Sequence, residues 1–406
     1  MPDTVARMFN PTHRYENICL PDCDTEPTVR WQRDIRGTTG LAVHDTLCIA
    51  AVDQGVVALQ ADGTPAWRFT TAGSFMLPTV GKQSVYVTSA GSTDDEYGYL
   101  HAVDIKSGTE NWRFELTGKG SKTSPAVVGE TVYVANGGSE SLYALDADTG
   151  ALQWSLDDIG PAYTSLAVVD ETVYVGTQGR LFDDNDGAVY AIDTDTGTVQ
   201  WRSATNDEIA SPLTVTADSV YVGGKSGLVY AIDSDTGDKN WQYSTGDSVE
   251  SSPAVVGGTV YIGSDDNSVY ALDATIGTVE WQFETNSTVR SSPLVVNDTV
   301  LVGSTDGSIY ALTAADGSKR WHLSLSNQDT SLFADHVSAG PVALEDMIYA
   351  ANGETIYGLR TNEEAQHSSK PNQITASEKS QDCPSCQSDL SEYGNPNFCP
   401  ECGAKQ

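Results

Sequence analysis

The sequence has few cations and no long apolar stretch. No uninterrupted apolar run approaches the roughly 18 residues of a membrane-spanning helix. The first residues, MPDTVARMFNPTHRYENIC, lack the apolar segment of a signal peptide. Lys and Arg number 22 against 56 acidic residues, which gives a net charge of −34. Because such a surface repels phosphates and anionic lipids, we expect a cytoplasmic protein that binds neither nucleic acid nor membranes.

The acidic residues are spread along the chain instead of being gathered in a tail. This distribution indicates a halophilic protein, since high salt screens the repulsion between like charges. The alternative is that the aspartates are turn residues multiplied by repetition.

Familiar catalytic motifs are also missing. The sequence contains no Gly-rich phosphate loop, no GxSxG and no HExxH, and its 6 histidines are scattered singly. These absences favour a protein that is not an enzyme.

A repeat is the main feature that the sequence does have. The 8 tryptophans recur about every 40 residues. A glycine stands four residues before seven of them. The tryptophans are Trp31, Trp67, Trp112, Trp154, Trp201, Trp241, Trp281 and Trp321; the glycines are Gly63, Gly108, Gly150, Gly197, Gly237, Gly277 and Gly317.

One repeat reads SSPAVVGGTVYIGSDDNSVYALDATIGTVEW from Ser251. Its short β-branched and aromatic runs, separated by GG, SDDN and DATIG, predict four strands joined by tight turns. Four strands in each of about eight repeats is typical of a β-propeller.

The two chain ends complete the count. TVRWQRD around Trp31 supplies a lone fourth strand, and residues 337–361 supply three strands without a tryptophan. We therefore predict an all-β, eight-bladed propeller over residues 29–361, closed by both chain ends in the last blade, which removes open sheet edges. Residues 1–28 form an N-terminal arm, and the propeller is expected to be monomeric.

The repeated residues have structural explanations. Asp, Thr and Gly in the DxDTG segments suit a tight turn, and copies that lack the charge argue against the alternative of repeated cation sites. A tryptophan at one place in each blade predicts packing between blades, with the indole N–H bonded to a neighbouring carbonyl.

The pattern AxDxxTGxxxW, as in Ala144, Asp146, Thr149, Gly150 and Trp154, resembles the tryptophan-docking motif of PQQ-type propeller repeats. The resemblance covers residues 29–361. It implies either quinoprotein dehydrogenases, which hold pyrroloquinoline quinone and calcium, or non-catalytic members such as the lipoprotein that assists barrel assembly.

The dehydrogenase alternative fits less well. Those enzymes resemble one another in a Cys-Cys pair, a tryptophan below the cofactor and a carboxylate-rich calcium site, whereas this sequence has no Cys-Cys pair and no spare tryptophan. We expect no quinone cofactor. A non-enzymatic protein-binding scaffold is the preferred interpretation, and a small-ligand sensor is a third.

Positions where the repeats differ are candidates for binding. The first strand of each blade is expected to line the central channel, so residues just before it would surround the channel mouth. Those residues are Phe75, Lys122, Tyr163, Ile209, Glu250, Arg290 and Ser338. Of these, Phe75, Lys122, Tyr163, Glu250 and Arg290 are candidates for a site that binds an anionic ligand or an acidic peptide; the alternative is unconstrained drift of loop positions.

Two longer connections, STDDEYG at 92–98 and RLFDDNDG at 180–187, occur in blades two and four. DDNDG resembles part of a calcium loop, but its glycine comes too early and no glutamate follows at the required place. Solvated acidic hairpins are the better interpretation.

The tail carries a metal-binding pattern. After a polar linker at 362–382, residues 383–406 contain Cys383, Cys386, Cys399 and Cys402 in a C-x2-C-x12-C-x2-C arrangement. Four thiolates at this spacing predict a small zinc ribbon that binds one structural zinc ion, without an open coordination position for catalysis. Metal binding would supply the folding free energy of so short a segment. We expect this module to dock onto a protein partner.

The other cysteines give weaker signals. Cys48 lies in the apolar segment LCIAAV and is expected in the core. Cys19 and Cys23 are either free thiols in the N-terminal arm or half of a metal site.

Overall fold

Every regular element of the described residues is a β-strand. This computed structural model describes residues 25–71, 73–90, 98–116, 123–179, 187–325, 337, 339–344 and 347–360. The chain divides into two compact units, Met1–Asn362 and Glu363–Gln406, and all described residues lie in the first. No helix of the described residues is long and apolar enough to cross a membrane.

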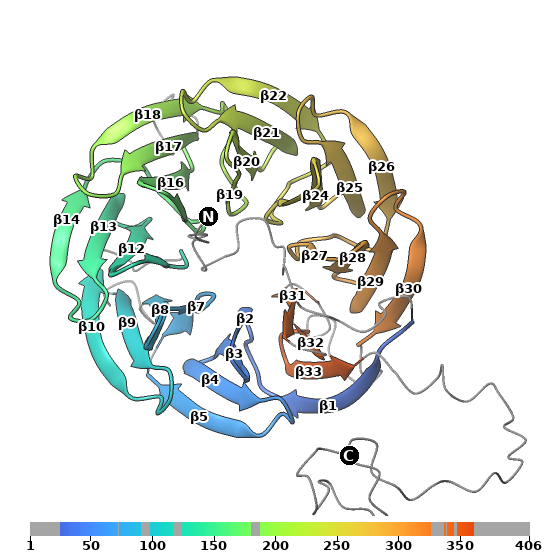
Figure 1. Ribbon diagram of the computed structural model, residues 1–406, viewed down its shortest axis with the longest axis horizontal. Coiled ribbons are helices and arrows are strands. Elements are labelled where there is room, and N and C mark those ends of the chain that lie inside the picture. The colour runs from blue at the N-terminus through green and yellow to red at the C-terminus, as the bar shows by residue number, and fades with distance from the viewer. Residues whose placement is uncertain are drawn as a thin grey trace, which may run out of the picture. The chain divides into compact units, whose positions relative to one another are not determined.

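The strands form eight antiparallel sheets arranged around a central axis, as the sequence predicts (Figure 1). Blades one to four comprise β2 (Gly40–His44), β3 (Leu47–Val52), β4 (Gly55–Gln60) and β5 (Pro65–Thr70); β6 (Ser74–Phe75), β7 (Thr79–Val80), β8 (Ser84–Ala90), β9 (Gly98–Asp104) and β10 (Glu110–Leu116); β11 (Ala126–Val128), β12 (Thr131–Asn136), β13 (Ser141–Asp146) and β14 (Leu152–Leu156); and β15 (Ala167–Val169), β16 (Thr172–Thr177), β17 (Ala188–Asp193) and β18 (Val199–Ala204).

Blades five to eight comprise β19 (Thr214–Val215), β20 (Ser219–Gly223), β21 (Leu228–Asp233) and β22 (Lys239–Ser244); β23 (Ala254–Val256), β24 (Thr259–Gly263), β25 (Ser268–Asp273) and β26 (Val279–Glu284); β27 (Leu294–Val296), β28 (Thr299–Gly303), β29 (Ser308–Thr313) and β30 (Lys319–Ser324); and β31 (Ala339–Leu344), β32 (Met347–Ala351), β33 (Thr355–Arg360) and β1 (Thr28–Asp34).

Both chain ends build the eighth blade. β1 is its outer strand and pairs antiparallel with β33, from Thr28 opposite Arg360 to Asp34 opposite Thr355. The sheet order β1-β33-β32-β31 therefore joins the first described strand to the last three. This pairing closes the ring without leaving an unpaired blade.

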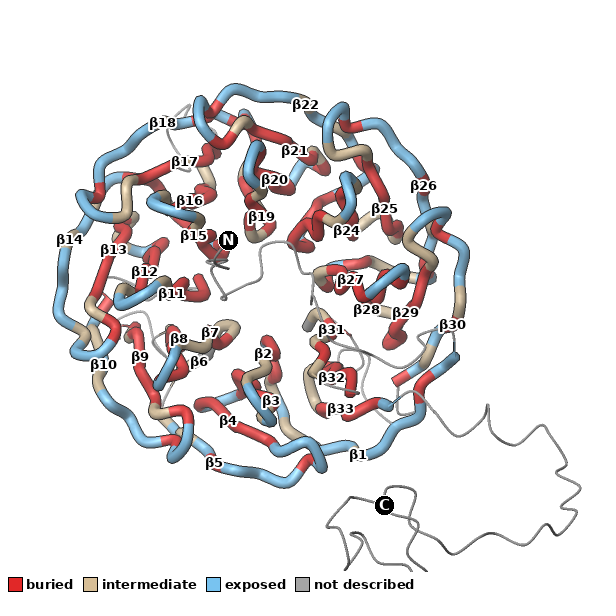
Figure 2. Tube along the Cα trace, in the orientation of Figure 1, coloured by how far each residue is buried: buried red, intermediate tan, exposed pale blue. Residues whose placement is uncertain are grey.

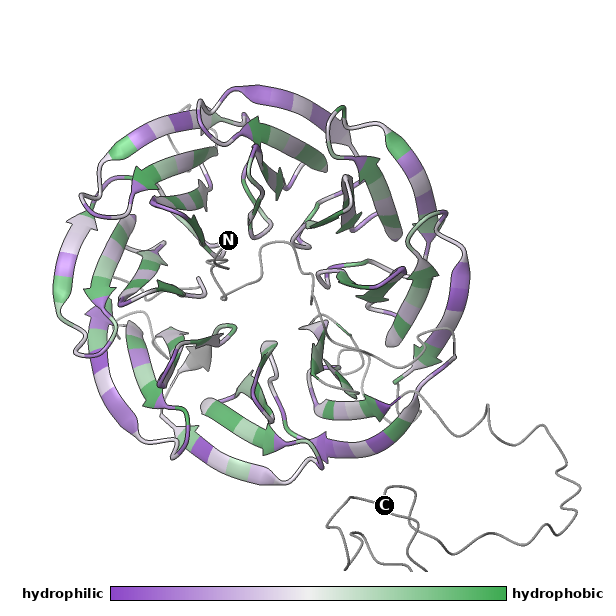
Figure 3. Ribbon diagram, in the orientation of Figure 1, coloured by the Kyte–Doolittle hydropathy of each residue, from purple (hydrophilic) through white to green (hydrophobic). Residues whose placement is uncertain are grey.

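The core lies between the blades. Eight clusters of buried apolar residues occur, one at each interface between neighbouring blades. The second and third strands, such as β24 and β25, are buried on both faces, whereas the outer strand β26 is mainly exposed, with Trp281 buried and Phe283 partly buried. Figures 2 and 3 show the same division: the outer strands are exposed and mainly hydrophilic, and the strands inside them are buried and mainly hydrophobic.

Each outer strand carries a β-bulge just before its tryptophan. In blade six Ala271 pairs with Trp281, but the next residue, Leu272, pairs with Val279, which leaves Glu280 unpaired. The same irregularity occurs in all eight blades. A bulge changes the direction of the following side chain, and it shifts the register immediately before each tryptophan.

Candidate functional site

The tryptophans join each blade to the next. Seven indole N–H groups donate to a backbone carbonyl in the following blade, at 2.7–3.0 Å. The acceptors are the carbonyls of Ala61, Ile105, Ala147, Thr194, Ser234, Ala274 and Ala314. The prediction that these residues pack between blades is confirmed.

In seven blades the glycine four residues before the tryptophan faces the indole of the preceding blade. A Cβ on Gly277 would lie 2.5 Å from Cδ2 of Trp241, and Gly277 has a φ of +70°. Both the close approach and the backbone conformation therefore require glycine. The carbonyl of Ala274 in the same turn also accepts the hydroxyl of Tyr221, at 3.1 Å.

The aspartates of the repeat stabilise turns. Oδ1 of Asp146 accepts the backbone N–H of Thr149 at 2.8 Å and its hydroxyl at 2.6 Å. These hydrogen bonds favour the carboxylate and lower the pKa of Asp146. Asp193 and Asp233 make the same contacts, so the turn interpretation is confirmed for these three.

Tyr163, Glu250 and Arg290, which were predicted to surround the channel mouth, lie on loops that connect an outer strand to the inner strand of the next blade. The register of these loops is fixed by a hydroxyl that binds the blade's second strand: Ser211, Ser251 and Ser291 each accept the N–H of a glycine, at 2.6–2.7 Å. The donors are Gly223, Gly263 and Gly303. Glu250 and Arg290 each precede this serine, and in blade five that place belongs to Ala210.

The sequence assignment of Ile209 to the mouth is therefore wrong. Ile209 is fully buried, as are Val249 and Val289 at the corresponding positions. The error arose because Pro212 stands one position earlier in its blade than Pro253 does in blade six. Thr214 pairs with Tyr221 as Ala254 pairs with Tyr261, so Leu213 occupies the place of Pro253. Tyr163 is 39% exposed and occupies the predicted position in blade four. Only the backbone of Phe75 is described, and Lys122 and Ser338 lie outside the described residues.

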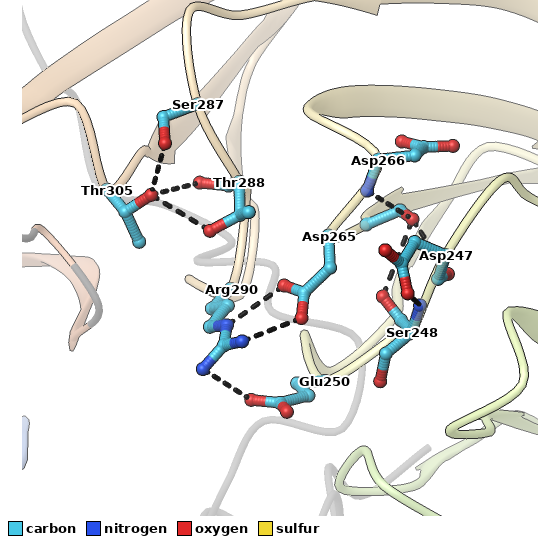
Figure 4. A network of polar contacts seen from close by, with 10 residues as sticks. Asp247, Ser248, Glu250, Asp265, Asp266, Ser287, Thr288, Arg290 and Thr305 are labelled. Carbon is cyan, nitrogen blue, oxygen red and sulfur yellow. Dashed lines mark hydrogen bonds and ion pairs between the residues drawn. The ribbon is translucent and has the colours of Figure 1, made fainter.

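Two of the predicted mouth residues are in contact. A guanidinium N–H of Arg290 approaches Oε2 of Glu250 at 3.5 Å. Arg290 also donates to both carboxylate oxygens of Asp265, through Nε at 2.9 Å and Nη2 at 2.8 Å (Figure 4). The hydrogen bonds to Asp265 raise the pKa of Arg290. Sequence reasoning missed Asp265, because it lies in the turn between β24 and β25.

The neighbouring blade carries a second ion pair. Nζ of Lys225 lies 2.9 Å from Oε2 of Glu208, and this contact raises the pKa of the lysine. We call the residues Glu208, Lys225, Asp247, Ser248, Glu250, Asp265 and Arg290 the mouth surface. Both of its cations are already bound to carboxylates within it.

A third cluster, unrecognised in the sequence, lies in blade two. Nδ1 of His101 is 2.7 Å from Oε1 of Glu110, and its Nε2 is 3.0 Å from the hydroxyl of Ser89. His101 occupies the place that Tyr143 and Tyr270 hold in other blades. Burial lowers the pKa of His101, with Glu110 opposing the shift. Ser89 is 2% exposed, so this arrangement offers no accessible nucleophile.

Known proteins that resemble this chain agree with the propeller architecture. A family model described as outer membrane protein assembly factor BamB matches residues 52–183 and 185–380. The chain belongs to the BamB family. A BamB from Moranella endobia (strain PCIT) is 30% identical over 129 residues, which cover 29% of this chain and 31% of that protein. The matched part thus spans less than a third of that BamB.

Solved structures share the propeller with this BamB-family chain. BamB from Moraxella catarrhalis has a TM-score of 0.67 at 19% identity, covering 84% of this chain and 100% of that one. Quinohemoprotein alcohol dehydrogenase from Comamonas testosteroni has a TM-score of 0.68 at 16% identity, covering 82% and 76%. A europium-containing methanol dehydrogenase reaches 0.70 at 13% identity, covering 87% and 96%. At these identities the likeness shows the fold alone.

The metal-binding predictions for this BamB-family chain concern other parts of it. Cys383, Cys386, Cys399 and Cys402 lie outside the described residues, as do Cys19, Cys23 and most of both longer connections. In the part that the structure describes, no group of three or more His, Cys, Asp or Glu residues is arranged to hold a metal ion. Cys48 is fully buried, which confirms its place in the core and raises the pKa of its thiol to about 12.

Proposed function

We propose that this protein is a non-enzymatic scaffold that binds other proteins through the mouth surface of its propeller. The observation that carries the proposal is the family match over most of the chain. That family is described as an outer membrane protein assembly factor, a role that calls for binding other proteins.

The different roles of the repeated and the variable residues support the same proposal. The residues that recur in each blade are used for packing and turns, as shown by Trp241, Gly277 and Asp146. The mouth surface, by contrast, differs from blade to blade and offers exposed charged groups. A surface that varies around a uniform frame suits recognition of an asymmetric partner.

The cysteine-rich tail adds a second docking module in this proposal. Cys383, Cys386, Cys399 and Cys402 bind one structural zinc ion, and the polar linker at 362–382 lets the ribbon reach a partner independently. The site of action is the cytoplasm of a halophile, in keeping with the net charge of −34.

Affinity purification from the native host tests the proposal. We expect the full chain to retain specific protein partners, and R290E, which reverses a charge of the mouth surface, to change which partners are bound there. A chain ending at Thr361 should lose only the partners held by the ribbon. Failure of the full chain to retain any partner would contradict the scaffold function.

The dehydrogenase alternative is tested separately. Purified protein is supplied with pyrroloquinoline quinone, calcium, a primary alcohol and an artificial electron acceptor. We expect no turnover above a protein-free control. Reproducible turnover would overturn the non-enzymatic function.

A further inference from the structure

At one pair of equivalent positions at this end of the propeller, the two side chains bind each other in blades five and seven but not in blade six. The backbone bond is the same in all three blades: the amide of a turn residue donates to a loop carbonyl. The pairs are Lys225 to Glu208, Asp265 to Ser248, and Thr305 to Thr288, at 2.8–3.0 Å. The side chains of the first and last pairs also bind each other, at 2.9 Å for Lys225 and Glu208 and 2.8 Å for Thr288 and Thr305.

In blade six the side chains of Ser248 and Asp265 do not bind each other. The carboxylate of Asp265 turns to Arg290 of the next loop, and the hydroxyl of Ser248 has no partner (Figure 4). Ser248 is only 8% exposed. Leaving a buried hydroxyl without a hydrogen bond is unfavourable, so the free protein keeps an unused polar group in this loop.

The charges around Ser248 are mainly negative. Asp247 is exposed, and its carboxylate accepts only the N–H of Ser248, at 2.7 Å. Glu250 is exposed and has the long contact with Arg290 as its ion pair. The guanidinium of Arg290 contacts Glu250 and Asp265, and the charge of Asp247 also acts on it. Three carboxylates near one guanidinium leave two negative charges uncompensated.

From these contacts we infer that the mouth surface at blade six binds a lysine or arginine side chain of the partner protein. The incoming cation pairs with Asp247 and Glu250, and the hydroxyl of Ser248 accepts one of its N–H groups. Arg290 stays on Asp265 and separates that carboxylate from the entering charge. This inference rests on the scaffold function and names the chemistry of its partner.

The test uses two short peptides as probes, one alternating arginine with serine and one alternating glutamate with serine. Their binding to the full chain is measured by fluorescence anisotropy in about 1 M salt, where the screening length falls to about 3 Å and diffuse attraction to the acidic surface is suppressed. We expect the arginine peptide to bind and the glutamate peptide not to bind.

Three variants locate the binding. D247N combined with E250Q should weaken the arginine peptide about tenfold, since both ion pairs are lost. The matched control, D148N combined with D195N, removes two exposed charges from turns at the other end of the blades and should leave the affinity unchanged. S248A should weaken binding a few-fold without lowering the melting temperature, because it removes an unbonded hydroxyl.

The substitution R290Q distinguishes between a site that binds cations and a site that binds anions. It frees Asp265 and removes a positive charge, so the arginine peptide should bind more tightly. Preferential binding of the glutamate peptide, abolished by R290Q, would overturn the inference, as would equal weakening by both double variants. If protein partners are still captured from the host when the arginine peptide fails, the scaffold function stands and only its basic partner is refuted.

Discussion

His101 shows how a single substitution within a repeat introduces a titratable group into the core. It replaces the tyrosine of other blades and lies between Ser89 and Glu110, with 1% of its surface exposed. Because burial disfavours the charged imidazole, its pKa in the folded protein is below that in the unfolded chain. The unfolded chain then binds more protons as the pH falls below about 6.5, and acid destabilises the fold.

We expect the free energy of unfolding to fall between about pH 7.5 and about pH 5.5, and H101F to make this fall smaller. Urea unfolding at the two pH values measures the difference. H101F also removes the hydrogen bonds to Ser89 and Glu110, so only the change with pH is informative. The control is H44Q, at a histidine whose side chain is 33% exposed; an unchanged pH dependence in H101F would contradict the assignment.

The roles of only some individual residues could be predicted from the sequence. The tryptophans and turn aspartates were predictable because each repeat restates their environment. The cluster of Ser89, His101 and Glu110 was not, since its members stand on three strands and no spacing rule connects them. Asp265 was missed for the same reason: its partner Arg290 belongs to the loop of another blade.

At the scale of elements, the turn before each outer strand is the joint between blades. Gly277 combines a φ of +70° with a place for Cβ only 2.5 Å from the ring of Trp241. Gly257 has a similar φ of +62° but nothing within 4 Å of its Cβ position. The two glycines therefore separate the backbone penalty from the packing penalty.

We predict that G257A destabilises the protein by about 1 kcal/mol through its backbone conformation alone. G277A should cost about 2–4 kcal/mol, because overpacking against Trp241 is added. Urea unfolding of both variants gives the comparison. Equal losses would mean that the indole does not hold the turn as described.

The strands themselves followed from the short apolar runs, but the eight β-bulges did not. A bulge leaves one residue unpaired, and Glu280 in this place looks like any other exposed strand residue in the sequence. The misplacement of Ile209 has a similar origin: the loop keeps its length, and the shift of Pro212 by one position is visible only through the strand pairing and the hydrogen bond of Ser211.

At the scale of the whole molecule, closure of eight blades was predictable from the unequal chain ends, because TVRWQRD lacked three strands and residues 337–361 lacked one. The net charge of −34 is the other global property. Turn aspartates such as Asp146 have a lowered pKa and so stay charged well into the acid range. Their mutual repulsion opposes the compact state when salt is low.

We therefore predict that reducing KCl from about 2 M to about 0.1 M lowers the melting temperature by about 10 °C or more, since the screening length grows to about 10 Å. Calorimetry at several KCl concentrations measures this. Sodium chloride at equal ionic strength should act similarly if screening is the cause. A melting temperature independent of salt would contradict adaptation of the surface to high salt.

The central claim, that partners bind at the mouth surface, is tested most directly by lysine-specific cross-linking of the complex purified from the host, followed by mass spectrometry. The few lysines make good reporters: Lys225 lies on the mouth surface with its side chain 64% exposed. Lys239 and Lys319 begin the outer strands β22 and β30, at the opposite end of the blades. We predict partner cross-links at Lys225 and not at the other two. Cross-links confined to Lys239 and Lys319 would contradict the account.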